Sequence, residues 1–230
     1  MYEKWLDTIN KCSLFQDMNP VGLQAMFECM GPRLGKYKKG ENLAIEGEKF
    51  EGIGIMLSGE AAVTKENAAG NRVIIDIVGP SDMFGEIAAF SAERAWPATV
   101  VAQDNCEVLF LPPDKIISEC QNLCLCHKNL VNNMLRIISD KALMLNKKVE
   151  YLTVKSLRGK ISKFLLEQQR TVKSTTFLMP MNRNELADFL NVSRPSLSRE
   201  MARMMEEGII DFYRSSVKIK DMEGLKNMIE

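Results

Sequence analysis

The sequence predicts an α+β chain in three consecutive parts: a β domain interrupted by glycines, one long helix, and a basic helical region. Three observations predict this order. Short apolar runs separated by glycine dominate residues 39–111. A stripe of apolar residues at steps of three and four follows, and two short helical segments with a turn between them come after residue 181. Runs bounded by turn residues indicate strands, and steps of three or four indicate helices.

The first part consists of short predicted strands bounded by turn residues. Their regular spacing indicates an antiparallel barrel or sandwich, because such folds join many short strands by tight turns. Residues 67–71 resemble a hairpin tip, where Gly70 supplies a positive φ. The predicted strands are residues 53–57, 61–63, 73–78, 98–102 and 107–111.

A helical pattern extends from residue 113 to residue 152. Its apolar stripe spans about eight turns, which is longer than one domain can cover. Pairing with the same helix of a second copy would bury the stripe in a coiled-coil-like homodimer. Val131 and Leu135 would then cover the contact with the chain's own β domain. The alternative is a helix that lies against that domain alone. The stripe consists of Leu123, Cys126, Leu130, Met134, Ile138, Ala142, Leu145, Val149 and Leu152.

A helix–turn–helix pattern runs from residue 182 to residue 207. In its first helix, the small side chain of Ala187 lets a second helix cross closely. Asn191 can adopt the left-handed conformation that the turn requires. Ser193 is a good N-cap for the second helix, and Pro195 lies in the first turn, where a missing N–H costs little.

The second helix of this pattern has an apolar face and a polar face. Leu197, Met201 and Met204 recur at helical spacing and should face inward. The polar face suits a DNA major groove, because arginine can donate two hydrogen bonds to guanine and serine can contact bases or phosphates. The alternative is a helical hairpin in a protein-binding domain. The candidate DNA-binding residues are Arg183, Arg194, Ser196, Ser198, Arg199 and Lys218.

Shorter elements surround the helix–turn–helix pattern. Ser156 can cap a helix that ends near residue 169, and residues 175–181 indicate a short strand. Residues 208–212 and 216–220 indicate a small hairpin, or wing, whose Arg214, Lys218 and Lys220 can contact backbone phosphates.

Charge is distributed unevenly along the chain. Residues 41–126 contain 14 acidic and 5 basic side chains, whereas residues 153–220 contain 13 basic and 7 acidic ones. The basic part can therefore face a polyanion, although chance distribution over two solvated surfaces is an alternative. No nucleophile–base pair, phosphate-binding loop or metal-ligand motif indicates an enzyme. The lack of an apolar signal core near residue 1, and of any run of eighteen apolar residues, predicts a cytoplasmic protein without membrane contact.

Several motifs together resemble those of one known family. NLAIEGE (42–48), LSGEAAV (57–63) and DMFGEIA (82–88) follow the order of a family β-roll, and VSRPSLSR (192–199) resembles its recognition helix. On these motifs the chain resembles the Crp/Fnr, or cyclic-AMP receptor protein, family over nearly its whole length. The resemblance implies a transcription regulator that acts as a homodimer on near-palindromic double-stranded DNA and recruits or blocks RNA polymerase.

The resemblance also implies a domain order and a position for the base-reading residue. It implies a β-roll effector domain of the cyclic-nucleotide-binding, jelly-roll type with N-terminal helices (1–112), a dimerisation helix (113–152) and a winged helix–turn–helix (153–230). Arg199 matches the guanine-reading arginine of the family. Pro195 stands where many relatives have glutamate, which should change one operator base.

The effector is implied by the β-roll and by a departure from its pattern. In cyclic-nucleotide sensors of the family, a Gly-Glu pair is followed by Arg-Ser, whose arginine pairs with the cyclic phosphate. Gly85 and Glu86 match the first pair, but Trp96 and Pro97 stand where Arg-Ser is expected. Because tryptophan cannot neutralise a phosphate, we expect a small effector other than cyclic AMP. Trp96 would line the pocket with Phe84, or would be a core aromatic. The candidate effector residues are Phe84, Gly85, Glu86, Trp96, Pro97 and Asn146, the last reaching across from the partner subunit.

A group of cysteine and histidine residues lies at the predicted start of the long helix: Cys120, Cys124, Cys126 and His127. Sulfur and imidazole can ligate haem iron, zinc or a cluster. A haem- or redox-based sensor of oxygen or nitric oxide with the same fold is therefore the alternative function. The ordinary interpretation is reduced, buried cysteines and a solvated His127, and it predicts no metal.

Overall fold

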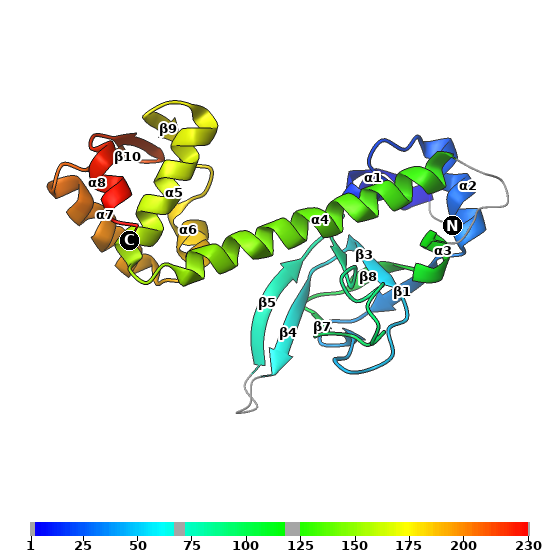
Figure 1. The fold of residues 1–230 in the computed structure, drawn as a ribbon. Helices are drawn as coiled ribbons and strands as arrows, with labels where there is room; N and C mark the ends of the chain where they lie inside the picture. The colour runs from blue at the N-terminus through cyan, green and yellow to red at the C-terminus, as the bar shows by residue number, and fades with distance from the viewer. Residues whose placement is uncertain (1–2, 67–71, 118–124, 230) are drawn as a thin grey trace. The chain divides into compact units, whose positions relative to one another are not determined.

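The computed structural model describes residues 3–66, 72–117 and 125–229 (Figure 1). The chain forms two compact units, Met1–Asp140 and Lys141–Glu230. Helix α4 (Leu125–Thr153) crosses the boundary between them. Within the described ranges, no helix has the length and apolar character that a membrane span requires.

The first unit begins with N-terminal helices, which the family resemblance implies without giving their bounds. A 3-10 turn (Glu3–Trp5), α1 (Leu6–Lys11), a second 3-10 turn (Ser13–Phe15) and α2 (Pro20–Met30) precede the strands. At the start of α2, the Asn19 side chain accepts from the Gly22 N–H at 2.7 Å. The helix ends at Gly31, whose φ of 59° is left-handed.

Two four-stranded antiparallel sheets form the body of the first unit, in the orders β1-β8-β3-β6 and β2-β7-β4-β5. Each of the five predicted runs lies in a strand, apart from Ala98, which precedes β7. The two-sheet arrangement therefore confirms the predicted sandwich or roll. The predicted hairpin tip at residues 67–71 lies outside the described residues. The strands are β1 (Arg33–Tyr37), β2 (Asn42–Ala44), β3 (Ile53–Ser58), β4 (Ala61–Glu66), β5 (Arg72–Val78), β6 (Met83–Phe84), β7 (Thr99–Ala102) and β8 (Cys106–Leu111).

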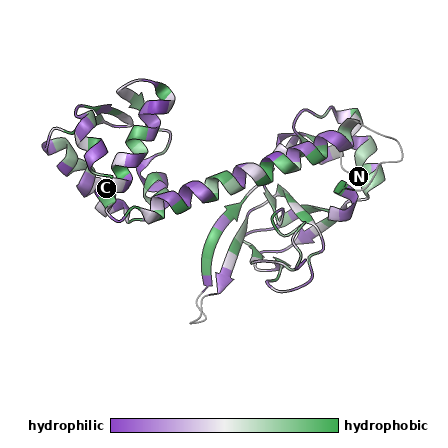
Figure 2. Cartoon of the chain, in the orientation of Figure 1, coloured by the Kyte–Doolittle hydropathy of each residue, from purple (hydrophilic) through white to green (hydrophobic). Residues whose placement is uncertain are grey.

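Strand β5 lies at the edge of its sheet, where it pairs with β4 alone. Its residues 72–77 are all exposed, and Figure 2 shows the strand as hydrophobic along much of its length. The exposed apolar side chains are Val73, Ile74, Ile75 and Ile77.

The predicted long helix begins later than expected. A separate short helix, α3 (Pro113–Ile117), precedes α4, and residues 118–124 lie outside the described residues. For the part of α4 in the first unit, the prediction of which face meets the partner and which face meets the β domain was wrong. Leu130 and Met134 are buried against the β domain, whereas Leu135 is exposed. Asn133 on the buried face donates from Nδ2 to the carbonyl oxygens of Leu14 at 3.0 Å and Gln16 at 2.9 Å, which orients this face towards the N-terminal helices.

The second unit contains the last turns of α4 and the winged helix–turn–helix. Ser156 caps α5 as predicted by accepting from the Gly159 N–H at 2.9 Å, and the helix continues to Val172. The wing sheet has the order β10-β11-β9. The remaining elements are α5 (Leu157–Val172), β9 (Thr176–Leu178), α6 (Arg183–Phe189), α7 (Arg194–Glu206), β10 (Ile210–Tyr213), β11 (Ser216–Ile219) and α8 (Met222–Asn227).

Candidate nucleic-acid interface and effector site

The turn between α6 and α7 has the geometry that its residues predict. Helix α6 starts with a capping box, in which Asn182 accepts from the Glu185 N–H at 3.1 Å and Glu185 accepts from the Asn182 N–H at 2.8 Å. Asn191 adopts a φ of 54°. The Val192 N–H then donates to the carbonyl of the buried Ala187 at 2.9 Å, which brings the two helices together.

Helix α7 has the predicted cap and the predicted inner face. The Ser193 side chain accepts from the Ser196 N–H at 3.2 Å, and its hydroxyl pairs with that of Ser196 at 2.8 Å. The Ser196 hydroxyl therefore has a partner within the cap. Leu197, Met201 and Met204 are fully buried in the core of the second unit, as predicted (0% exposed each).

The outer face of α7 is basic and open. Arg194, Ser198 and Arg199 are all exposed on the side away from the core. Among the residues that the structure describes, no ion pair engages Arg194 or Arg199. Their guanidinium groups are therefore available to a ligand outside the chain.

An arginine that the sequence analysis missed pairs with two of the acidic side chains near the end of α7, Glu200 and Glu207. Arg158 on α5 donates from Nη1 and Nη2 to both oxygens of Glu207, at 2.6 and 2.8 Å, and from Nε to Glu200 at 2.5 Å. The hydrogen bonds from Arg158 also lower the pKa of Glu207. The acidic residues in the second half of α7 were a signal that a cation had to lie opposite. Because Glu200 and Glu207 are paired, they compete less with Arg194 and Arg199 for the field at the outer face of α7.

Arg183, predicted to contact DNA, points into the second unit. Its guanidinium lies 4.9 Å from the centre of the Phe212 ring and its Nη1 lies 2.6 Å from Met201 Sδ. Burial lowers the pKa of Arg183. This position gives Arg183 a packing role between α6, α7 and β10.

In the wing, one lysine is paired and another is open. Lys220 forms an ion pair with Asp211 at 3.1 Å, which lowers the pKa of that carboxyl group. Lys218 stands opposite Asp211 in the β10–β11 register and is exposed. Arg214 has a φ of 53° at the tip of the hairpin and lies 5.4 Å from the Tyr213 ring centre.

In the first unit, three of the predicted effector residues meet in an aromatic cluster: Phe84, Gly85 and Trp96. Trp96 is 5% exposed, and its ring centre lies 4.5 Å from that of Phe50 and 5.9 Å from that of Phe84. Gly85 has a φ of 84°, and a Cβ there would lie 2.7 Å from the Trp96 ring. Only glycine satisfies both the backbone angle and the close approach.

The remaining effector candidates lie in different surroundings. Glu86 is buried beside Gly85. Pro97 and Asn146 are exposed. Arg94, the arginine nearest to Trp96 in sequence, has an ion pair with Asp114 at 3.0 Å on the surface, so its charge is directed away from the aromatic cluster.

Two family models match the chain, one for each unit of this architecture. A cyclic nucleotide-binding domain matches residues 34–122, and a Crp-like helix-turn-helix domain matches residues 159–228. The chain belongs to the Crp/Fnr family of transcription regulators. This family consists of DNA-binding regulators and not of enzymes.

Relatives of the Crp/Fnr regulator extend along most of its length. It is 23% identical over 226 residues to the CRP-like cAMP-activated global transcriptional regulator of Mycobacterium tuberculosis, covering 95% of this chain and 97% of the relative. It is 25% identical over 193 residues to the transcriptional activator protein FnrA of Stutzerimonas stutzeri, covering 82% and 77%. The catabolite activator protein of Thermus thermophilus matches its fold with a TM-score of 0.54 at 19% identity, covering 94% and 98%.

Two members of the cysteine and histidine group of the regulator, Cys126 and His127, lie within the described residues. His127 is buried, not solvated as predicted, and its Nε2 lies 2.9 Å from the Ile116 carbonyl oxygen, at hydrogen-bond distance. Cys126 lies against α2, where a Cβ on Gly22 would be 2.2 Å from its Sγ. Cys120 and Cys124 lie outside the described residues. In the described ranges, no group of three or more His, Cys, Asp or Glu side chains could hold a metal ion. Four described cysteines are free thiols: Cys12, Cys29, Cys106 and Cys126.

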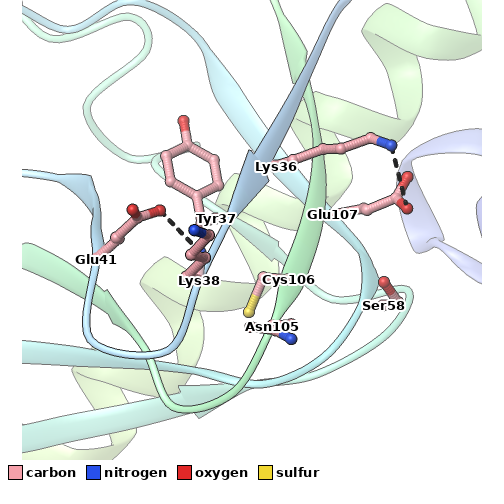
Figure 3. Close-up of a pocket in the computed structure, with 8 residues that line it drawn as sticks. All are labelled: Lys36, Tyr37, Lys38, Glu41, Ser58, Asn105, Cys106 and Glu107. Carbon is pink, nitrogen blue, oxygen red and sulfur yellow. Dashed lines mark hydrogen bonds and ion pairs between the residues drawn. The ribbon is translucent and has the colours of Figure 1, made fainter.

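A polar hollow on the first unit was not predicted from the sequence (Figure 3). Its volume is about 510 Å³. Glu41 accepts from the Lys38 N–H at 2.8 Å, and Lys36 pairs with Glu107 at 3.9 Å. Because carboxylates and lysines alternate around it, the hollow favours neither an anion nor a cation. Its lining consists of Lys36, Tyr37, Lys38, Glu41, Ser58, Asn105, Cys106 and Glu107.

Proposed function

We propose that this Crp/Fnr regulator binds a near-palindromic operator as a homodimer, with α7 of each copy in a major groove. The observation that carries this proposal is the open basic face of α7, opposite the buried Leu197, Met201 and Met204. Arg199 is the residue we assign to a guanine, through hydrogen bonds to O6 and N7. Arg194 and Ser198 contact neighbouring bases or phosphates.

The other proposed DNA contacts differ in kind. Ser196 keeps its hydroxyl in the cap with Ser193, so it acts by fixing the first turn of α7. Lys218 contacts a backbone phosphate from the wing, because it is exposed on β11. Arg183 stabilises the position of α7 through its contacts with Met201 and Phe212. RNA polymerase is the expected protein partner at the operator.

A second apolar stripe on α4, which starts at Val131 and differs from the predicted one in its N-terminal half, supports the homodimer. Seven residues follow alternating steps of four and three, which is the spacing that supercoils two helices around each other. At the C-terminal end of the stripe, Leu145, Val149 and Leu152 are between 54% and 58% exposed. A second copy of α4 would cover them. The stripe consists of Val131, Leu135, Ile138, Ala142, Leu145, Val149 and Leu152.

A small effector in the β-roll is the proposed input signal. Gly85 and Glu86 occupy the position that the resemblance assigns to effector contact, and Phe84 and Trp96 form its aromatic wall. Pro97 and Asn146, which are exposed, complete the proposed site from the roll and from the partner's α4. With Trp96 in place of an arginine, a cyclic phosphate would lack its counter-charge, so we propose an effector other than cyclic AMP. An effector shifts DNA binding only if it binds one state of the protein better than the other.

Selection from a pool of random DNA duplexes tests the proposal. We expect the protein to enrich two inverted half-sites whose centres lie about one helical turn apart. Enrichment of single, asymmetric sites would contradict the dimer, and no enrichment would contradict sequence-specific binding. Titration of the selected operator with and without small metabolites then tests gating, because affinity that no metabolite changes would contradict it.

A further inference from the structure

Tyr151 anchors the last turn of α4 inside the second unit. Between residues 141 and 153, all of which the structure describes, it is the only buried residue, at 1% exposed. Its ring centre lies 4.9 Å from that of Phe189 on α6 and 6.4 Å from that of Phe164 on α5. Aromatic rings at such separations attract one another beyond the burial of their area.

Two ion pairs flank this aromatic contact. Lys147 pairs with Glu167 at 3.0 Å, and Glu150 pairs with Lys163 at 3.1 Å. The Lys163 ammonium also lies 5.2 Å from the Tyr151 ring centre. Burial, and then the neighbouring Glu167 carboxylate, raise the pKa of Tyr151, so its phenol stays neutral. One face of the last two turns of α4 is therefore held against α5 by charge, packing and cation–π attraction.

The short linker after α4 has little freedom to act as a hinge. Ser156 is fixed by its cap on the Gly159 N–H. A Cβ on Gly159 would lie 2.8 Å from Val154 Cγ1 and 2.7 Å from the Met228 carbonyl oxygen. Val154 and Ser156 thus pack against the first turn of α5.

We propose that Tyr151 is a positioning residue for operator recognition. It fixes the DNA-binding unit to the end of α4, so that rotation of α4 about its own axis sets the direction in which α7 points. This inference rests on the proposed function, since it assumes that paired α4 helices present two α7 helices to DNA. Tyr151 itself makes no contact with DNA.

The test compares operators in which the two half-sites are in phase or are separated by an additional half turn of DNA. For the unchanged protein, the additional half turn should weaken binding about 100-fold or more, because one α7 then faces the wrong side. In Tyr151→Ala, the DNA-binding unit of each copy is no longer fixed to its α4. The loss of affinity caused by the additional half turn should then fall below about tenfold, and the affinity for random DNA should be unchanged. Full discrimination in Tyr151→Ala overturns the inference. Failure of the unchanged protein to select any two-fold site is a different result, and it counts against the proposed function instead.

Charge reversal gives a second test that does not remove a core residue. Lys147→Glu replaces the ion pair with Glu167 by two neighbouring carboxylates, and it should also reduce the discrimination, by about threefold. Lys173→Glu is the matched control, because it makes the same charge change at the exposed end of α5. The control should weaken binding equally at both spacings. If Lys147→Glu behaves like Lys173→Glu, the inference is wrong, even where Tyr151→Ala does not fold.

Discussion

Leu145→Ala should weaken the homodimer that the α4 stripe predicts. Leu145 is 58% exposed in the single chain, and two copies of it would be covered in the dimer. Burial of a whole leucine side chain contributes about 1.5–3 kcal/mol. Covering the exposed part of both copies therefore contributes about 1.7–3.5 kcal/mol, and its loss should raise the dimer Kd about 20- to 350-fold.

Sedimentation equilibrium over a range of protein concentrations measures this Kd directly. Leu143→Ala is the matched control: Leu143 is 66% exposed on the same helix but lies outside the stripe, so its removal should leave the dimer unchanged. An equal loss of dimer in the two variants would mean that the stripe does not define the interface. An unchanged Kd for Leu145→Ala would refute the paired-helix model.

Three further predictions concern DNA and pH. Arg199→Ala should lose about 1–3 kcal/mol at the selected operator and nothing on random duplexes, as measured by fluorescence anisotropy; equal losses on both would refute a base-reading role. Lys218→Ala should weaken binding to all sequences alike and reduce the slope of log affinity against log salt by about one; an unchanged slope would exclude a phosphate contact. Burial raises the pKa of Cys12 from 9.0 to about 11. Its neutral thiol therefore contributes stability that is fully present below pH 9 and is lost as the pH rises towards 11. Denaturant unfolding should show a smaller alkaline loss in Cys12→Ala; an identical loss would exclude this contribution.

Strands and turns were predictable where the local sequence alone determines them. Apolar runs between turn residues located β3, β4, β5, β7 and β8. Asn191 and Ser193 determined the turn and the cap by their own backbone and side-chain preferences. In contrast, β1 contains a glycine and two basic residues, and β6 has only two residues, so neither carries a local signal. Pairing with β8 and β3 forms these strands.

The inner face of α4 could not be predicted from periodicity. Leu130 and Leu135 both fit an apolar stripe. The burial of Leu130 and the contacts of Asn133 with the carbonyls of Leu14 and Gln16, which periodicity does not reveal, show which face lies on the first unit. The family resemblance implied N-terminal helices, but it gave neither their bounds nor their contacts with α4.

The outer residues of α7 were predictable because their exposure follows from the spacing of Leu197, Met201 and Met204. The direction of a long side chain, in contrast, could not be predicted from the spacing of residues along a helix. Arg183 is on the first helix of the pattern, but its guanidinium lies on Phe212, far along the sequence. Arg158 lies before the whole pattern, and only the fold brings it to Glu200 and Glu207.

The exposed edge strand β5 has a consequence for solubility that is separate from stability. Its sequence, RVIIDIV, joins an open row of backbone donors and acceptors to apolar side chains on both faces, which is the composition of segments that assemble into fibrils. Asp76 interrupts the run, and its carboxylate also accepts from the Ile77 N–H at 2.9 Å. Within residues 73–78 it is the one charge, which is the kind of residue that opposes strand stacking. We therefore expect Asp76, which contributes little to the folded core, to influence the yield of soluble protein.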